Sequence, residues 1–267
     1  MYKNNPLKYT SKGKIRKRYS NPFNYPRINP KLHNEKVPIK IQEILIGSLL
    51  GDCSGESQKK GINPCFSFKQ SVKHINYLFY IYFIFLHWGY AQPFAVPIIR
   101  KTKDSRGNIH EYLRFRTITS PNLLKIYNMF YTIENDKKIK RVPLNLGRYL
   151  TRRALAFWIM DDGGMSGQGL LLHTNSFTYE EVLFLINILE KKFKLEAIPR
   201  KKYNRHIIYI KATSIPELIK LVKPYMHSDF YYKLVQTPNP KGLGVRSRCL
   251  APPCFAGGCG QLGIINK

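Results

Sequence analysis

The sequence predicts an α+β fold built from two similar halves. Two apolar segments, residues 37–52 and 152–162, have the length of buried helices and end in acidic residues. Each is followed in the same order by a strand, a capped helix, a basic hairpin, a second capped helix and a lysine. Because this order occurs twice, we interpret the chain as a twofold repeat of elements, although the residue identities differ between the copies.

The composition indicates a folded protein with a polyanionic partner. The 267 residues are 43% hydrophobic, which is enough for a sizeable core, and they carry a formal charge of +28. Such a charge excess repels itself in a compact state unless a polyanion offsets it. Since Tyr and Phe are abundant, with 18 and 15 residues, the charge does not belong to a disordered basic tail. A nucleic acid is the first candidate partner, and an anionic membrane surface is the second.

The first half has clear signals for its elements. Ser71 is placed to cap the helix that follows the first strand, and Ser120 with Pro121 is placed to start another helix. Turn residues at 104–108 separate two strands and predict a hairpin. After the first acidic helix the predicted elements are a strand at 66–70, a helix at 71–88, strands at 96–103 and 109–118, a helix at 120–131 and a polar linker at 134–141.

The second half repeats these elements. Thr178 with Glu181 and Ser214 with Glu217 each have the spacing of a capping box at a helix start. The predicted elements are a strand at 170–174, a helix at 178–192, strands at 197–202 and 206–212, and a helix from 214. We place the first half at residues 37–145 and the second at residues 146–236.

Both ends of the chain are predicted to lack a packed structure. Residues 1–36 are basic and rich in Asn-Pro and Tyr-Pro pairs, which is typical of a flexible arm that either contacts phosphates or is solvated. Residues 237–267 are rich in Pro and Gly without periodicity, which predicts a disordered tail. The five cysteines are odd in number and favour a reducing compartment. The spacing of Cys249, Cys254 and Cys259 is not a common zinc pattern.

The most apolar helix does not predict a membrane span. Residues 77–86 are apolar on all sides, so we expect this helix to be buried. The uninterrupted part is well short of the roughly 20 residues that a bilayer requires. We therefore expect no membrane association.

Basic residues are expected on the open faces of both sheets. In the strand at 109–118, Tyr112, Arg114 and Arg116 alternate with Leu113 and Phe115, so one face is cationic and the other packs inward. A two-stranded ribbon fits the major groove of a DNA duplex, although an ordinary solvated face explains the same pattern. The candidates for contact with phosphates or base edges are Lys69, Arg100, Lys101, Lys103, Arg114, Arg116, Arg200, Lys202, Tyr209 and Lys211.

The acids at the two helix ends indicate a cation site. A carboxylate is unfavourable at a helix C-terminus, where the helix dipole is negative, and a bound cation would remove the conflict. Asp52 and Asp162 each end a matched apolar helix, which suggests that they lie side by side. Two carboxylates with a divalent metal ion can activate water and stabilise the leaving oxygen of a phosphodiester. On spacing alone, Lys140 and Lys233 are surface lysines, although each is also suited to polarise a water molecule.

These acidic helices resemble a known pair of motifs. Residues 45–53 (LIGSLLGDC) and 155–163 (LAFWIMDDG) resemble the two signature motifs of single-chain LAGLIDADG homing endonucleases. Residues 158–164, 175–178 and 232–234 add to the resemblance, which covers roughly residues 37 to 236. It implies two pseudo-symmetric αββαββα halves that form a saddle of antiparallel sheets over DNA, with the motif helices packed at the centre.

The resemblance also implies roles for individual residues. Asp52 and Asp162 match the metal-binding acids, and Lys140 and Lys233 match lysines beside the active-site water. The implied cofactor is Mg²⁺, with Mn²⁺ as a substitute. The chain departs from the family pattern where Cys53 and Phe157 replace glycines. Because small residues allow helices to approach closely, we expect Phe157 to lie against the groove left by Gly47 and Gly51.

The resemblance, together with these residues, implies a monomeric, site-specific endonuclease that cuts both strands of double-stranded DNA at a long asymmetric target. It is expected to be synthesised in a mitochondrion or chloroplast, from an intron or a free-standing frame. One alternative is an intron-encoded maturase that binds intron RNA to assist splicing, with or without DNA cleavage. Another is a DNA-binding regulator that does not cut. Retention of both acids and both lysines favours the nuclease.

Overall fold

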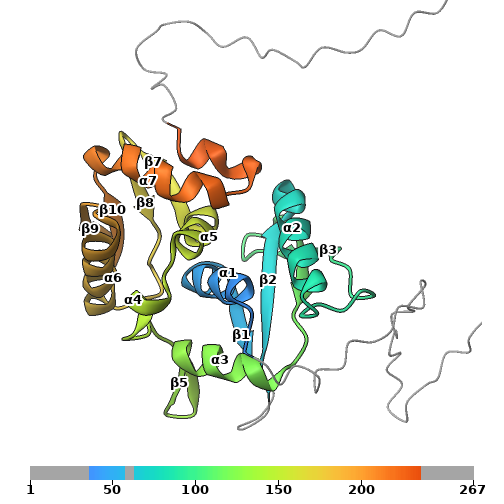
Figure 1. The fold of residues 1–267 in the computed structure, drawn as a ribbon. Coiled ribbons are helices and arrows are strands. Elements are labelled where there is room, and N and C mark those ends of the chain that lie inside the picture. The colour runs from blue at the N-terminus through green and yellow to red at the C-terminus, as the bar shows by residue number, and fades with distance from the viewer. Residues whose placement is uncertain (1–35, 58–62, 236–267) are drawn as a thin grey trace, which may run out of the picture. The chain divides into compact units, whose positions relative to one another are not determined.

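The computed structural model describes residues 36–57 and 63–235, and the predicted α+β class is confirmed (Figure 1). Two four-stranded antiparallel sheets are each accompanied by helices. The predicted N-terminal arm, apart from its last residue, and the predicted C-terminal tail with Cys249, Cys254 and Cys259 lie outside the described residues.

The first half contains one sheet with the strand order β1-β2-β4-β3 and an additional two-stranded hairpin, β5-β6. Short 3₁₀ turns precede α2 and α3. The elements are α1 (Ile39–Leu50), β1 (Ser54–Glu56), β2 (Cys65–Ser71), α2 (Ile75–His87), β3 (Ile98–Lys103), β4 (Ile109–Arg116), α3 (Leu124–Phe130), β5 (Tyr131–Glu134) and β6 (Lys137–Lys140).

The second half repeats the sheet with the order β7-β8-β10-β9, so each strand of the first sheet has a counterpart in the second. The predicted repeat of elements is therefore confirmed. The elements are α4 (Leu146–Tyr149), α5 (Arg152–Asp162), β7 (Gly163–Ser166), β8 (Gly169–Leu172), α6 (Tyr179–Phe193), β9 (Ala197–Lys202), β10 (Arg205–Ile210), α7 (Ile215–Val222) and a final 3₁₀ segment (Ser228–Lys233).

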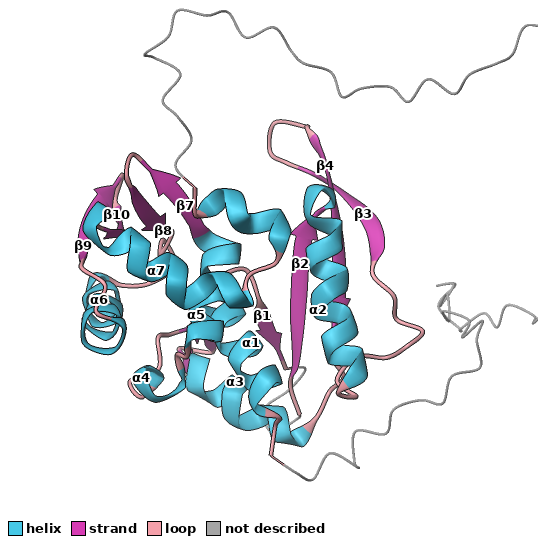
Figure 2. Ribbon diagram, turned by 45° about the horizontal axis from the view of Figure 1, so that its top comes forward, coloured by secondary structure: helices cyan, strands magenta, loops and turns pink. Residues whose placement is uncertain are grey.

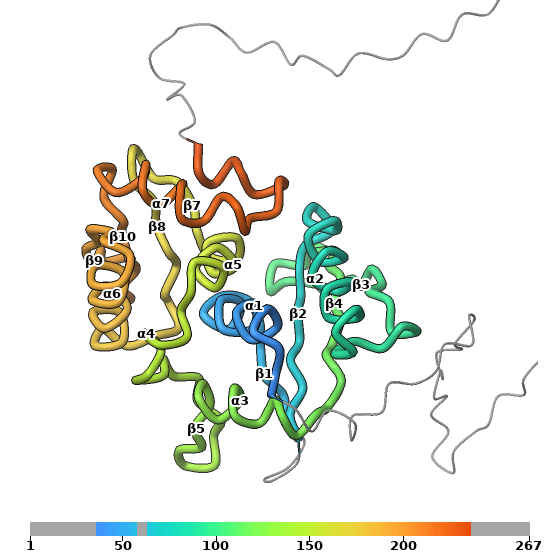
Figure 3. Tube along the Cα trace, in the orientation of Figure 1, coloured from blue at the N-terminus to red at the C-terminus, as the bar shows by residue number. Residues whose placement is uncertain are grey.

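The helices bury one face of each sheet. Helix α2 packs on β2 and β4, and α6 packs on β9 and β10 (Figure 2). Helices α1 and α5 pack directly on each other and bring the two halves into contact (Figure 3). Every residue from Ile44 to Leu50 and from Ala154 to Met160 is buried, so these two helices form the centre of the core.

Glycine allows α1 and α5 to approach closely. A Cβ atom added at Gly47 would lie 2.1 Å from the Ala154 carbonyl oxygen and 2.8 Å from Cβ of Phe157. The expectation for Phe157 is therefore confirmed at Gly47. It is wrong at Gly51, where an added Cβ would lie 2.5 Å from Cβ of Asp161 instead. The last turn of α1 thus packs against a carboxyl-bearing residue of α5.

The helix starts follow the sequence signals only in part. The Thr178–Glu181 capping box is present, and the Ser71 hydroxyl accepts the Lys73 amide, as predicted. Ser120 and Ser214 lie at the predicted helix starts, each followed by a proline in the first turn, but the expected caps are absent because neither hydroxyl accepts a backbone amide of that turn. The Ser214 hydroxyl instead accepts the Glu196 backbone amide at 2.8 Å and joins the helix start to the strand region before β9.

The predicted polar linker at 134–141 is wrong, because most of it forms the hairpin β5-β6. Asn135 and Asp136 make the turn with φ values of 49° and 58°. Asn and Asp tolerate this left-handed conformation better than most residues, and paired positive φ values suit a tight hairpin turn. This hairpin places Lys140 at the end of β6.

The expectation that α2 is buried on all sides is also wrong. Tyr77, Leu78 and Phe85 are buried, but Phe83 is 57% exposed and Tyr80 is 38% exposed. Within the part of the chain that the structure describes, no helix has both the length and the apolar character needed to cross a bilayer.

Candidate active site

The ends of the two central helices meet, as the acids predicted. Asp162 is the last residue of α5, and Asp52 follows the glycine that ends α1. The side-chain amide of Gln70, on β2, lies between them. Its Nε2 is 3.5 Å from Oδ2 of Asp52 and 3.3 Å from Oδ1 of Asp161, the neighbour of Asp162. One amide group therefore reaches acids from both helix ends.

Each helix end is also contacted by a lysine. The ammonium of Lys140 donates to the carbonyls of Gly51 and Cys53, at 3.2 Å each. The ammonium of Lys233 donates to the carbonyls of Ile159, Met160 and Asp161, with the shortest distance of 2.6 Å to Met160. These carbonyls are at the negative ends of the helix dipoles, where a cation is favourable.

The reading of these lysines as surface residues is therefore wrong. Lys233 is only 9% exposed, and Lys140 is partly buried. Burial lowers the pKa of both ammonium groups, although the nearby carboxylates act in the opposite direction. A buried and a partly buried lysine thus accompany the acids, one from each half.

The acids are held in an environment that disfavours their charge. Burial raises the pKa of Asp162 to about 7, and the charge of Asp52 adds to this, while Lys140 and Lys233 oppose it. Burial also raises the pKa of Asp52, although its side chain reaches solvent, and raises that of Asp161 well above its usual range. A bound cation would favour the ionised carboxylates and remove this conflict.

The donor set fits a magnesium ion better than a softer metal. Among residues 36–57 and 63–235, no three His, Cys, Asp or Glu side chains converge on a metal position. The groups that Asp52 and Asp162 offer are carboxylates, one from each helix end. Mg²⁺ prefers this number of protein carboxylates, with water and phosphate oxygens in its other positions.

The raised pKa of Asp162 predicts a measurable effect on stability. Its pKa is about 7 in the folded chain, whereas the ordinary value of an aspartic acid is 3.8. Between these pH values unfolding releases a proton from Asp162. The free energy of unfolding therefore falls as the pH rises from about 4 to about 7. Asp162→Asn removes this cost. In metal-free buffer we expect it to raise the free energy of unfolding by about 2 kcal/mol at pH 8, after allowance for partial exposure, and to have little effect near pH 4.

Urea denaturation at the two pH values measures this difference. Asp136→Asn, in the exposed β5-β6 turn, is the matched control and should change neither value. An equal gain for Asp162→Asn at both pH values would contradict the assigned cause.

The first sheet presents four of its six predicted contact residues on one face. Leu113 and Phe115 of β4 are buried, so the alternate residues lie on the opposite, open face. The strand register places Lys69, Arg100, Arg114 and Arg116 on that face. Lys101 and Lys103 alternate to the other face, where Lys101 forms a 2.9 Å ion pair with Glu111.

The second sheet presents a similar face. Ile208 and Ile210 of β10 are buried, and Tyr209 between them lies on the open face. The register places Arg200 and Lys202 on the same face, with the Arg200 guanidinium 3.2 Å from the Tyr209 ring centroid. Lys211 follows β10 and pairs with Glu196 at 3.0 Å.

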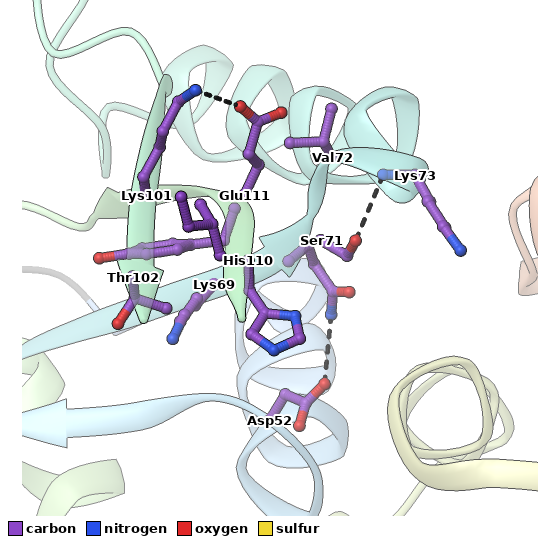
Figure 4. Close-up of a pocket in the computed structure, with 12 residues that line it drawn as sticks. Asp52, Lys69, Ser71, Val72, Lys73, Lys101, Thr102, His110 and Glu111 are labelled. Carbon is purple, nitrogen blue, oxygen red and sulfur yellow. Dashed lines mark hydrogen bonds and ion pairs between the residues drawn. The ribbon is translucent and has the colours of Figure 1, made fainter. Parts of the chain in front are cut away.

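An open groove of about 1070 Å³ connects Asp52 with the first sheet. Asp52, Lys69 and His110 are among the residues that line it (Figure 4). Gln70 lines it as well. A ligand in this groove would contact the basic strands and one of the acidic helix ends together.

Three residues near the acids had no predicted role. Gln70 follows Phe66 and Phe68 on the buried side of β2, and a polar residue at an inward position is a signal that the sequence did offer. Asp161 was visible as a second acid beside Asp162. Tyr77 of α2 donates a 3.1 Å hydrogen bond to Oδ1 of Asp161, and nothing in the local sequence indicates this contact.

Comparisons with known proteins agree with this geometry. The pattern of the LAGLIDADG DNA endonuclease family matches residues 42–218. The chain is 35% identical over 201 residues to the cytochrome b mRNA maturase bI2 of Saccharomyces cerevisiae, covering 73% of this chain and 47% of that protein. It is 44% identical over 159 residues to the intron-encoded endonuclease ai4 of Dictyostelium discoideum, covering 58% of this chain and 98% of that one.

A solved structure shows the same fold. The homing endonuclease I-WcaI bound to its DNA recognition sequence superposes with a TM-score of 0.67 and 31% identity, over 76% of this chain and 89% of that one. The match to the first of these relatives spans about half of that relative's length, 47%. The family pattern, the duplicated sheets and the paired acidic helix ends agree, and the chain belongs to the LAGLIDADG DNA endonuclease family.

Proposed function

We propose that this protein is a site-specific DNA endonuclease that makes a metal-dependent double-strand break at a long asymmetric target. The observation that carries the proposal is the meeting of two acidic helix ends at one amide, with a lysine ammonium bound to the carbonyls of each helix end. The I-WcaI structure is bound to its DNA recognition sequence, which supports double-stranded DNA as the substrate here.

Each group has a role in this proposal. Asp52 and Asp162 would hold Mg²⁺ or Mn²⁺, which when bound lowers the pKa of a water molecule and stabilises the leaving oxygen. Lys140 and Lys233 bring positive charge to the place where negative charge develops on the phosphate. Because burial lowers their pKa values, these lysines are also better proton donors than exposed lysines near neutral pH.

The open sheet faces are proposed to bind the DNA. Phosphate contacts by Lys and Arg position a duplex, and base contacts select its sequence. Arg200 stacked on Tyr209 is held in a fixed orientation, which suits bidentate recognition of a base edge. We assign the first sheet to residues 37–145 and the second to residues 146–236, as two halves of one monomeric chain that contact two parts of one asymmetric target.

The names of its relatives support a proposal for where the protein is synthesised. One relative is named a cytochrome b mRNA maturase and another an intron-encoded endonuclease. These names support synthesis in a mitochondrion or another organelle, from an intron or a free-standing frame.

A randomised duplex library tests the proposed function. The full chain is incubated with the library and Mg²⁺, and the cut ends are sequenced. We expect one long target sequence to be enriched, with cuts in both strands, and no cuts when EDTA replaces Mg²⁺. Recovery of no enriched sequence by a folded protein would reject the endonuclease.

A maturase is the second candidate, and the identity to the cytochrome b mRNA maturase favours it. Such a protein binds intron RNA, and RNA binding does not require the acids proposed for cleavage, Asp52 and Asp162. If the chain assists splicing, Asp162→Asn should leave splicing intact while it stops DNA cleavage. The two activities are therefore separable in one variant, and a splicing assay on its own intron decides whether both are present.

We expect DNA binding to weaken steeply with salt. The exposed Arg and Lys side chains of the two sheets would release counterions from phosphates, which predicts a slope of log K against log salt of about −5 or steeper. Lys202→Ala, on the second sheet, should reduce the magnitude of that slope by about one. Fluorescence anisotropy with the recovered duplex, in metal-free buffer, measures both slopes, and a flat response would contradict the proposed interface.

A further inference from the structure

Asp161 is a carboxyl group that the two-acid mechanism does not use. It lies where α5 approaches the end of α1 and is partly buried, with its Oδ2 facing Gly51. A Cβ atom added at Gly51 would lie 3.1 Å from that oxygen, so a side chain at this position would crowd the Asp161 carboxyl group. A buried charge-bearing group is costly unless it is hydrogen-bonded, which raises the question of what this carboxyl does.

Two donors from the first half converge on the other oxygen of this carboxyl. The hydroxyl of Tyr77 donates to Oδ1 at 3.1 Å, and Nε2 of Gln70 donates to it at 3.3 Å. The Tyr77 ring is held in place by Phe230, with ring centroids 4.7 Å apart in an edge-on arrangement. Asp161 therefore joins α5 to both α2 and β2 at the position where the acids meet.

These contacts determine which way the Gln70 amide faces. A glutamine side chain has one donor end and one acceptor end, and the two are similar in shape. Both neighbours of the donor end, Asp52 and Asp161, are carboxyl groups that accept hydrogen bonds. With Nε2 engaged by both acids, Oε1 is the atom left to accept a proton of a water molecule in the groove that Gln70 lines.

In the described part of the second half, the position that corresponds to Gln70 holds no amide. We align the two halves on Asp52 and Asp162. When the β1-β2 pairing is extended, Gln70 lies opposite the residue before Asp52. The β7-β8 pairing, extended in the same way, places Thr174 opposite the residue before Asp162, so Thr174 is the counterpart of Gln70. Thr174 is fully buried, and its hydroxyl donates to the His206 carbonyl at 3.0 Å. Of these two counterparts only Gln70 carries an amide, and the proposed metal-binding acid that it contacts is Asp52.

We infer that Asp161 is a positioning residue of the cleavage site, which orients the Gln70 amide and thereby favours hydrolysis of one strand over the other. The inference rests on the proposed endonuclease function. A carboxyl group that only filled space between the helices would affect both strands equally, because α1 and α5 carry both acids.

A double-mutant cycle on each strand separates these roles. The variants are Gln70→Ala, Asp161→Ala and the double variant, with single-turnover cleavage of the recovered duplex labelled on either strand. We expect each single variant to slow the same strand by about tenfold to a hundredfold, as for a misplaced reacting group. The double variant should be at most about twofold slower than the slower single variant. If the rate reductions of the two single variants multiplied in the double variant, or if both strands were slowed equally, the inference would be overturned.

Conservative variants keep the inference testable if Asp161→Ala does not fold. Asp161→Ser retains a polar group that is too short to reach Gln70, and it should slow the same strand. Asp161→Asn keeps an acceptor for Gln70 and should stay within about threefold of the wild type. A loss for Asp161→Asn as large as for Asp161→Ala would show that the charge matters and not the orientation.

A measurement on the metal-free protein without DNA is independent of cleavage. In a sample labelled with ¹⁵N-glutamine, the side-chain amide signal that disappears in Gln70→Ala belongs to Gln70. We expect this signal to be shifted in the wild type and in Tyr77→Phe, and to move to solvent-exposed values in Asp161→Ala or Asp161→Ser. If the Gln70 signal does not move in Asp161→Ala or Asp161→Ser, the inference is rejected. If the wild-type protein binds DNA but cuts no duplex, the proposed function is rejected, and this measurement still tests the contact between Asp161 and Gln70.

Discussion

Asp162→Asn is expected to abolish double-strand cleavage while DNA binding remains close to that of the wild type. The side chain keeps its shape and loses only its charge, so the packing of α5 against α1 should be preserved. Without the carboxylate, the proposed cation would be held by Asp52 alone, and the charge that develops in the reaction would be poorly stabilised. We expect the single-turnover cleavage rate to fall by at least about a thousandfold, and Asp52→Asn to behave in the same way.

The measurement uses the recovered duplex with Mg²⁺ for cleavage and the metal-free protein for binding. Asp136→Asn is again the matched control, because the residue lies in an exposed turn with φ of 58°, which Asn tolerates well. Cleavage by Asp162→Asn at the wild-type rate would remove the assigned role of this residue, even if binding were unchanged.

The sequence predicted the acidic helix ends because the signal there is local. A run of apolar residues that ends in an acid is visible within a dozen positions, and the conflict with the helix dipole indicates what must compensate it. The same physics explains the lysines, whose ammonium groups bind the carbonyls at these helix ends. Their sequence position, 88 and 71 residues after Asp52 and Asp162, carries no such local signal.

The rest of the site depends on contacts between distant residues. Gln70 and Asp161 are separated by 91 positions, and Tyr77 and Asp161 by 84. No periodicity or cap relates them, and only the packing of α1 on α5 brings them together. The hairpin β5-β6 was missed for a different reason, since its strands are short and mostly exposed, and alternation of polar and apolar residues is weak there.

Burial is also what gives the acids their chemistry. Isolated on the surface, Asp162 would be ionised at any physiological pH. Between two helix ends and beside Asp52, its pKa rises to about 7, so a proton would compete with the proposed metal ion near neutral pH. The close approach of α1 and α5 is therefore a condition for the function as well as for the fold.

Gly47→Ala tests that condition directly, and we expect it to destabilise the fold strongly. The added Cβ would lie 2.1 Å from the Ala154 carbonyl oxygen, which is a backbone atom and cannot rotate away. The helices must separate, so we expect a loss of about 3 kcal/mol or more in the free energy of unfolding. Since the acids lie at the ends of these helices, the folded fraction should also cleave more slowly than the wild type.

Gly147→Ala is the matched control for urea denaturation. Gly147 lies in α4, and an added Cβ would have Ile188 as its nearest neighbour at 3.9 Å, which is an ordinary contact. Because alanine favours helix more than glycine does, this variant should be unchanged or more stable by up to about 1 kcal/mol. If Gly47→Ala unfolded at the same urea concentration as the wild type and cut both strands at the same rate, the close approach of α1 and α5 would not be what brings Asp52 and Asp162 together.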